Sequence, residues 1–171
     1  MNVKPNSYQK YLHRFLMLKP VSALLAVVLH RADTLLLRLT KGNRTFTRIA
    51  GLPIIQLTAK GARTGQWRTM PLAGIPDGDK VVVVASNFGQ KQYPGWYHNL
   101  KAHPECEVRI NGKSQTRVAR ETYGDERIHY FQVAVSYYAG YLKYEERAAP
   151  RRVPVMVLEL KTDQGGPAGP P

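Results

Sequence analysis

The chain has 171 residues, of which 43% are hydrophobic and 22% are charged. This length suits a single domain with a real hydrophobic core, and the composition fits neither wholesale disorder nor a membrane-spanning protein. The only cysteine, Cys106, excludes an internal disulfide and any metal site built from several cysteines, and it fits a reducing cytoplasm. Because Glu105 and Glu107 flank this thiol and would raise its pKa, we expect it to be structural.

The net charge of +13 is the unusual feature of the composition. The first 60 residues hold ten Lys or Arg and a single acidic residue, Asp33. Such a charge attracts phosphate groups of any kind, so nucleic acid, anionic lipid and a phosphorylated cofactor all remain open as partners. No basic run is interleaved with a nucleic-acid-reading motif, and we therefore expect no specific nucleic-acid binding.

Two amphipathic helices are predicted in residues 1–45. Apolar residues recur at helical spacing from Tyr8 to Leu16, and Pro20 then interrupts the pattern. A second helix is predicted from Val21 to Lys41, and its charged residues leave no apolar run of the ~20 residues that a membrane span requires. This basic extension suits docking on the domain itself, on a partner, or on the inner face of an anionic membrane.

From residue 52 the pattern changes to short strands joined by turns. Strands are predicted over 53–58, 67–75, 80–86, 106–110, 114–120 and 153–160, and helices over 96–102 and 125–137. The β-branched run from Val81 to Val84 predicts a central strand buried on both faces. Asn111-Gly112 predicts a tight hairpin turn. The 125–137 helix is expected to have one apolar side, formed by Ile128, Phe131, Gln132 and Val135.

This order of elements predicts an α+β fold. Residues 46–161 should form a small barrel of mostly antiparallel strands with flanking helices, and residues 162–171 a disordered tail. The five histidines lie at no metal-ligand spacing with carboxylates, so we expect no metal site. Nucleophile-elbow, dinucleotide-binding and Walker-type motifs are missing from the sequence, which disfavours hydrolase, Rossmann and P-loop chemistry.

The turn from Gly61 to Arg68 is the first segment that could carry chemistry. Its two glycines let backbone N–H groups face outward, and Arg63, Thr64 and Arg68 add donors suited to a phosphate or carboxylate. The alternative is a solvated basic turn.

Two further segments combine small residues with aromatics. Residues 85–91 follow the buried strand and lead into Pro94–Leu100, where a helix N-terminus could hold a phosphate beside a planar ring; the alternative is that Trp96 and Tyr97 cap the core. Tyr138, Tyr141 and Tyr144 recur every three residues and could close a pocket and orient a substrate, and core packing is their alternative.

Together these segments resemble the deazaflavin-dependent nitroreductase family, whose members adopt a split β-barrel and use coenzyme F420. The resemblance runs from about Leu52 to Glu159. Its carriers, in this order, are residues 57–72 (LTAKGARTGQWRTMPL), Val83–Ser86, Pro94–Leu100, His103-Pro104, Tyr138–Tyr141 and Val153–Val155.

The resemblance implies an oxidoreductase that transfers a hydride from reduced F420 to a quinone, a nitro compound or a similar planar electrophile, with a tyrosine hydroxyl or water supplying the proton. FMN is the alternative cofactor. The residues implied to act on the substrate are Tyr138, Tyr141, Tyr144 and Ser86. The residues implied to bind the cofactor are Arg63, Thr64, Gly65, Arg68, Thr69, Pro71, Ser86, Asn87, Phe88, Gly89, Gln90, Pro94, Trp96, Tyr97 and Asn99.

Four positions differ from the common pattern of this family. Ala62 stands where Arg or Lys is common, Trp67 where Pro is common, and Asn87-Phe88 where Lys-Gly is common. A peripheral lipid- or fatty-acid-binding member of the same fold, with weak or no F420 activity, is therefore the alternative function. The resemblance fits either a monomer or a homodimer, in the cytoplasm or at the inner face of the membrane.

Overall fold

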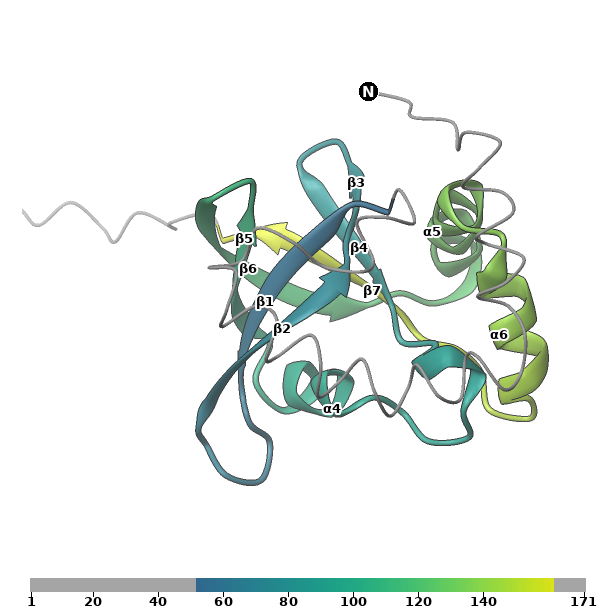
Figure 1. Ribbon diagram of the computed structural model, residues 1–171, viewed down its shortest axis with the longest axis horizontal. Coiled ribbons are helices and arrows are strands. Elements are labelled where there is room, and N and C mark those ends of the chain that lie inside the picture. Colours follow the sequence, from purple (N-terminus) through teal and green to yellow (C-terminus); the bar gives the residue numbers. More distant parts are fainter. Residues whose placement is uncertain (1–51, 162–171) are drawn as a thin grey trace, which may run out of the picture.

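A computed structural model describes residues 52–161, which form seven strands, three α-helices and one short 3-10 helix (Figure 1). The strands are β1 (Ile54–Lys60), β2 (Trp67–Ala73), β3 (Ile75–Asp77), β4 (Lys80–Val84), β5 (Glu105–Ile110), β6 (Lys113–Glu121) and β7 (Val155–Leu160). The helices are η1 (Asn87–Gly89), α4 (Gly95–Ala102), α5 (Gly124–Tyr137) and α6 (Gly140–Ala148).

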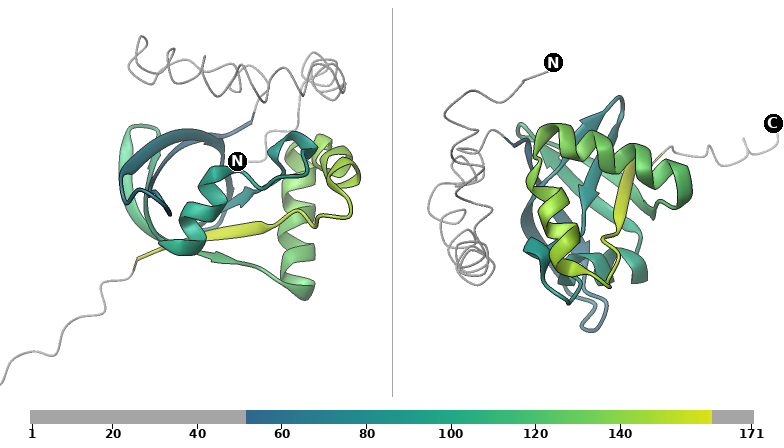
Figure 2. Two further views of the ribbon diagram at one scale, coloured as in Figure 1. Left: turned by 90° about the horizontal axis from the view of Figure 1, so that it is seen from below. Right: turned by 90° about the vertical axis from the view of Figure 1, so that its right-hand side faces the viewer.

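All seven strands belong to one antiparallel sheet with the order β2-β1-β5-β6-β7-β4-β3. The sheet curls into a barrel, and α4 lies across one end of it (Figure 2). Helix α5 packs against β3, β4 and β7 on the outside of the barrel, while α6 packs against α5 and η1. The fold is thus the predicted α+β barrel of antiparallel strands with flanking helices.

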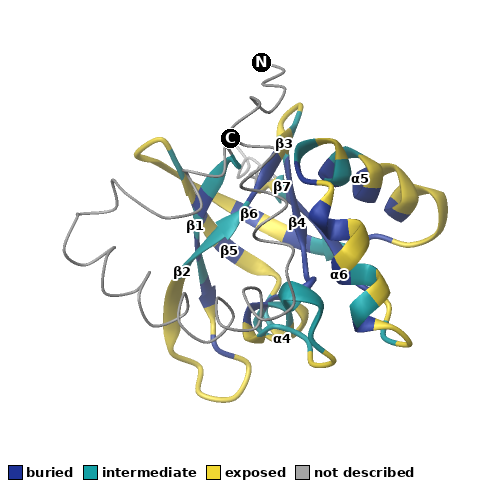
Figure 3. Ribbon diagram, turned by 45° about the vertical axis from the view of Figure 1, so that its right-hand side comes forward, coloured by how far each residue is buried: buried dark blue, intermediate teal, exposed yellow. Residues whose placement is uncertain are grey.

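Strand β4 separates two hydrophobic cores. Val81 and Val83 face the barrel interior, where they join Trp96 and Leu100 of α4. The alternate residues of β4, Val82 and Val84, belong to a second core that includes side chains of α5 and α6. The run of buried residues along β4 is visible in Figure 3. Each fully buried side chain of this size contributes about 1.5–3 kcal/mol, so both cores stabilise the fold.

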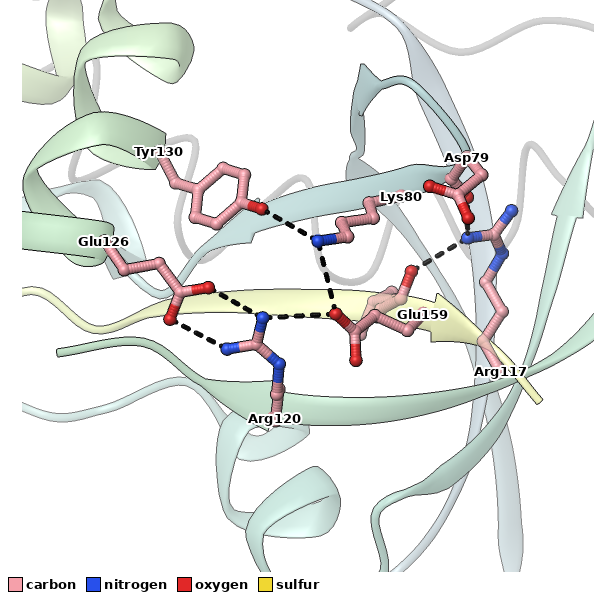
Figure 4. A network of polar contacts seen from close by, with 8 residues as sticks. Asp79, Lys80, Arg117, Arg120, Glu126, Tyr130 and Glu159 are labelled. Atoms are coloured by element: carbon pink, nitrogen blue, oxygen red, sulfur yellow. Dashed lines mark hydrogen bonds and ion pairs between the residues drawn. The ribbon is translucent and has the colours of Figure 1, made fainter. Parts of the chain in front are cut away.

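Charged side chains attach α5 to the outer face of the sheet (Figure 4). Arg120 of β6 bonds both carboxylate oxygens of Glu126 on α5, at 2.7 and 2.8 Å, and also reaches Glu159 of β7 at 3.1 Å. Lys80 donates to the Tyr130 hydroxyl at 3.4 Å and lies 3.5 Å from Glu159. These side chains are partly exposed, so each pair contributes little to the stability of the fold.

The prediction of one continuous strand over 67–75 was wrong, because the chain breaks at the buried Gly74. A Cβ atom on Gly74 would lie only 2.6 Å from Cγ2 of Ile55, and its N–H donates to the Pro53 carbonyl at 2.9 Å. At this close contact the chain passes directly from β2 into β3, which pairs with β4 at the other end of the strand order, so the two edges of the curled sheet lie next to each other there. Pro76 is tolerated there because an edge strand leaves one row of backbone donors unpaired.

Two further predictions need correction. Strand β4 is buried on both faces as expected but lies second from the edge of the sheet, not at its centre. On α5, Ile128 and Gln132 are exposed, and the buried residues are Arg127, Tyr130, Phe131 and Ala134. The buried face is displaced because Arg127 donates to the Val153 carbonyl at 2.9 Å and stacks over Phe131.

The predicted helices of residues 1–45 and the predicted tail of residues 162–171 lie outside the described residues. Within residues 52–161, no helix is long and apolar enough to cross a membrane, and no three His, Cys, Asp or Glu side chains gather to hold a metal ion. Burial raises the pKa of the Cys106 thiol to about 12, consistent with the structural role expected for it.

Candidate functional site

The β1–β2 hairpin extends beyond the barrel and carries the Gly61–Gln66 loop at its tip (Figure 1). The loop is closed by two backbone hydrogen bonds, from Gly61 N–H to the Gln66 carbonyl at 2.8 Å and from Gly65 N–H to the Gly61 carbonyl at 2.9 Å. Gly61 is buried, and a Cβ atom there would lie 2.7 Å from Oγ1 of Thr64. Gly65 has a φ of +67°, which glycine adopts without strain. Both glycines are therefore required by the shape of the loop.

Three cations surround this loop, and none of them has a counter-ion in the described part of the chain. Lys60, Arg63 and Arg68 are exposed, and no ion pair or side-chain hydrogen bond to them is present among residues 52–161. Arg68 lies on the same side of β2 as Met70, which packs against the barrel core. Lys60 and Trp67 are paired with each other on the outer side of the hairpin. The loop is thus open to an anionic ligand from both faces.

Asn99 of α4 fixes the hairpin loop against the end of the barrel. Its Oδ1 accepts a hydrogen bond from the Ala62 N–H at 3.0 Å. Thr69, another predicted cofactor-binding residue, has its hydroxyl 2.8 Å from that of Thr58 on the outer face of the hairpin. Pro71 is half-buried on that same outer face, opposite to the side on which Arg68 lies. In this structure Asn99 and Thr69 both hold the hairpin in place.

The second predicted segment, Ser86–Gln90, forms a left-handed turn. Asn87, Phe88 and Gly89 have φ values of +48°, +56° and +80°. Phe88 stands where the related family commonly has glycine, and its ring contacts Tyr144 edge-on with centroids 6.0 Å apart. The Asn87 side chain donates to the Gln92 carbonyl at 3.0 Å, and Ser86 is buried at the end of β4.

Arg151 holds this turn, and sequence analysis missed it. Its guanidinium donates to the carbonyl oxygens of Ala85 (3.2 Å), Ser86 (2.9 Å) and Gln90 (2.8 and 3.1 Å). It also stacks over the Tyr93 ring, with its central carbon 4.8 Å from the ring centroid. The only sequence signal was a pair of arginines directly before the last buried strand, and nothing in their spacing pointed to a loop some sixty positions earlier.

The residues that open α4 are divided between the barrel core and its rim. Trp96 is 8% exposed and belongs to the barrel core, as in the core-capping alternative. The Tyr97 hydroxyl donates to Glu121 of β6 at 2.9 Å, and burial together with this carboxylate raises the pKa of Tyr97 to about 12. Pro94 precedes the helix, whose first turn contains no acidic residue. The positive end of the α4 dipole is therefore not neutralised by its own side chains.

The three tyrosines of the Tyr138–Tyr144 segment form one packed cluster. Tyr138, Tyr141 and Tyr144 are each 4–5% exposed and belong to the outer core, and the hydroxyl oxygens of Tyr138 and Tyr144 lie 3.0 Å apart. Burial raises the pKa of all three hydroxyls, so they are neutral at pH 7. The cluster adjoins the left-handed turn, because Gly89 lies against the backbone of Tyr144.

The predicted residues therefore gather in two neighbouring groups. One group consists of the hairpin loop and α4, linked by Asn99 and Ala62. The other consists of the Ser86–Gln90 turn, α6 and Arg151. The stacked rings of Tyr93 and Tyr97, with centroids 4.9 Å apart, connect the two.

Solved structures share this fold. A structure described as an F420-H2 dependent reductase (FDR-A) is 37% identical, with a TM-score of 0.58, covering 63% of this chain and 94% of that one. A structure described as a domain-swapped dimer is 34% identical, with a TM-score of 0.60, covering 77% and 96%.

Sequence comparison gives the family. An F420H(2)-dependent quinone reductase of Mycobacterium tuberculosis is 36% identical over 115 residues, which cover 65% of this chain and 76% of the relative. The model of the family described as F420H(2)-dependent quinone reductase matches residues 29–160. The chain belongs to the F420H(2)-dependent quinone reductase family.

Proposed function

We propose that this protein is an F420-dependent oxidoreductase that reduces a quinone, or a nitro compound or similar planar electrophile, with reduced F420. The observation that carries the proposal is the basic hairpin loop, which has no counter-ion among residues 52–161, in a chain that belongs to this family. Exposed arginines without counter-ions are suited to bind phosphate and carboxylate groups, and the tail of F420 is acidic.

The residues present fit such a cofactor. Arg63 and Arg68 would hold the phosphate and acidic tail, and Lys60 adds a third cation that sequence analysis did not assign. A Cβ atom added to Gly95 at the start of α4 would meet no atom within 4 Å, so the helix N-terminus is open to an anionic group. The Ser86–Gln90 turn would border the ring system.

The reduced deazaflavin, when bound, supplies the hydride. The quinone takes up this hydride and one proton and leaves as a hydroquinone. Because burial raises the pKa values of Tyr138, Tyr141 and Tyr144, their hydroxyls are poor sources of a proton. Water is then the source of the proton.

The test combines cofactor binding with turnover. We expect F420 to bind in a fluorescence titration of the purified protein, and reduced F420 to be oxidised when a simple quinone is added without oxygen. Arg63→Gln and Arg68→Gln should each weaken binding about tenfold, since a charge-assisted hydrogen bond contributes ~1.5–3 kcal/mol.

Arg109→Gln is the matched control. Arg109 is also exposed and its loss changes the net charge equally, but it lies on β5 and bonds only to the nearby Gly112 carbonyl at 3.3 Å. An equal loss of affinity in this variant would show that only net charge matters. Absence of F420 binding to the unmodified protein at tens of micromolar would refute the proposed function.

A further inference from the structure

The Ser86–Gln90 turn is held in a conformation that its own residues disfavour. Three consecutive residues, Asn87, Phe88 and Gly89, have positive φ values, and two of them are not glycine. The left-handed conformation is unfavourable for a residue with a Cβ atom, and least so for Asn. Such a turn persists only when its surroundings impose it.

The turn has few bonds of its own. Gly89 N–H donates to the Ser86 carbonyl and Gln90 N–H to the Asn87 carbonyl, both at 3.0 Å. On the outer side, a Cβ atom on Gly89 would lie 2.9 Å from Cβ of Arg147 and 3.2 Å from the Tyr144 backbone, so α6 limits the turn sterically. The Asn87 side chain also donates to the Gln90 side chain at 3.5 Å and to the Gln92 carbonyl at 3.0 Å, and none of these bonds joins Ser86 to Gln90.

Arg151 ties the two ends together. One guanidinium nitrogen, Nη2, donates to both the Ser86 and the Gln90 carbonyl, while Nη1 reaches Ala85 and Nε donates again to Gln90. Its acceptors in the described structure are backbone carbonyls, and no carboxylate pairs with it there. Arginine reaches these three acceptors from three nitrogen atoms of its planar fork, whereas lysine would have to reach them from one.

The position of Arg151 in the fold explains its reach. Ala85 N–H donates to the Pro154 carbonyl at 2.9 Å, so the segment before β7 runs antiparallel to the segment after β4. Arg151 therefore lies beside the two ends of the turn, Ser86 and Gln90. Tyr93, at the other end of the same loop, covers its guanidinium.

We propose that Arg151 is a positioning residue for the cofactor ring, acting through the Ser86–Gln90 turn. This inference rests on the proposed function, in which that turn borders the ring system. Arg151 fixes the turn with Phe88 directed at Tyr144, and so sets the distance between the ring site and the tyrosine cluster. A displacement of about 1 Å at such a site can lower turnover about a hundredfold.

The experiment compares Arg151→Met and Arg151→Lys with Arg152→Met. Arg152 is the exposed neighbour and loses the same charge, which makes it the matched control. Arg151→Met should raise the Kd for F420 and lower kcat, each by about tenfold or more, with a smaller change in the KM for the quinone. Arg151→Lys should recover part of the loss, and Arg152→Met should behave as the unmodified protein.

Hydrogen exchange of the turn amides separates this inference from the proposed function. The N–H groups of Gly89 and Gln90 should exchange faster in both Arg151 variants, whether or not F420 binds. If the unmodified protein does not bind F420 but these amides exchange faster in the Arg151 variants, Arg151 does hold the turn, and its role in positioning the cofactor is refuted. If Arg151→Met does not fold, Arg151→Lys carries the same comparison. Unchanged exchange and unchanged Kd in a folded Arg151 variant would overturn the inference.

Discussion

Gly140 gives the Tyr138 ring the space that it occupies. A Cβ atom built on Gly140 would overlap the ring carbons Cζ and Cε1 and the hydroxyl of Tyr138. Gly140→Ala should therefore force Tyr138 out of the cluster and lower the free energy of unfolding by ~1–3 kcal/mol, as overpacking of a core does. Denaturant unfolding measures this loss.

The control for this prediction is Gly95→Ala. Its added methyl group meets no atom within 4 Å, so it should be neutral or slightly stabilising, by up to about 1 kcal/mol. In the double variant Tyr138→Ala/Gly140→Ala, the alanine at 140 should cost less than it does alone, because the overlapping ring is gone. Equal costs in the two backgrounds would contradict the overlap.

At the scale of elements, one carboxylate links α4 to strand β6 of the barrel. Glu121 of β6 accepts hydrogen bonds from the Tyr97 hydroxyl at 2.9 Å and from Lys101 at 3.0 Å. Burial alone would raise the pKa of Glu121, but these donors outweigh it and hold the pKa below the ordinary value of 4.5. A lowered pKa stabilises the fold above pH 4.5, and this stability is lost as the pH falls below that value.

Glu121→Gln should therefore unfold at a lower temperature at pH 7. Its free energy of unfolding should be lower by about 1 kcal/mol, since the site is partly exposed. Its disadvantage relative to the unmodified protein should shrink as the pH falls below 4.5 and the native carboxylate becomes protonated. Thermal unfolding followed by circular dichroism at several pH values checks this. If the stability difference between Glu121→Gln and the unmodified protein stays constant over this pH range, the ionised Glu121 carboxylate does not link α4 to β6. Glu105→Gln, whose carboxylate is exposed, is the control.

Local sequence signals predicted most elements of the fold. The Asn111-Gly112 turn joins β5 and β6 as expected, since positive φ values of +49° and +83° suit these two residues. The long-range features were not predictable. Gly74 ends β2 only because Ile55 approaches it from β1, and the buried face of α5 includes Arg127 only because the Val153 carbonyl accepts its hydrogen bond.

The candidate site, too, could be predicted from the sequence only in part. The hairpin loop, the turn after β4 and the tyrosines were recognisable as motifs because each is contiguous in the chain. Arg151 was not, because its acceptors in Ala85, Ser86 and Gln90 lie far away in sequence and are backbone atoms, which carry no residue-type signal. Hydrogen bonds from side chain to distant backbone appear only once the strands are paired.

At the scale of the whole molecule, the two cores share one feature, which is that tyrosine hydroxyls are buried in or beside them. Four of the eight tyrosines in residues 52–161 have raised pKa values, namely Tyr97, Tyr138, Tyr141 and Tyr144. Burial is the largest cause in each case. Their ordinary pKa in an unfolded chain is 10.0, so unfolding above that pH releases protons that the folded state retains.

The sign of the effect follows from this difference. A raised pKa contributes stability that is fully present below pH 10 and is lost as the pH rises toward the folded-state value. Each such tyrosine should lower the free energy of unfolding by about 1.4 kcal/mol per pH unit above pH 10. We therefore expect a cooperative alkaline transition, in which the phenolate absorbance of these four tyrosines rises together with the loss of circular dichroism. Tyr138→Phe/Tyr144→Phe should move this transition to higher pH and reduce its steepness, since two of the four groups no longer release protons. Ionisation of all ten tyrosines while the barrel remains folded would show that the tyrosine cluster opens without unfolding, and would place its hydroxyls within reach of solvent.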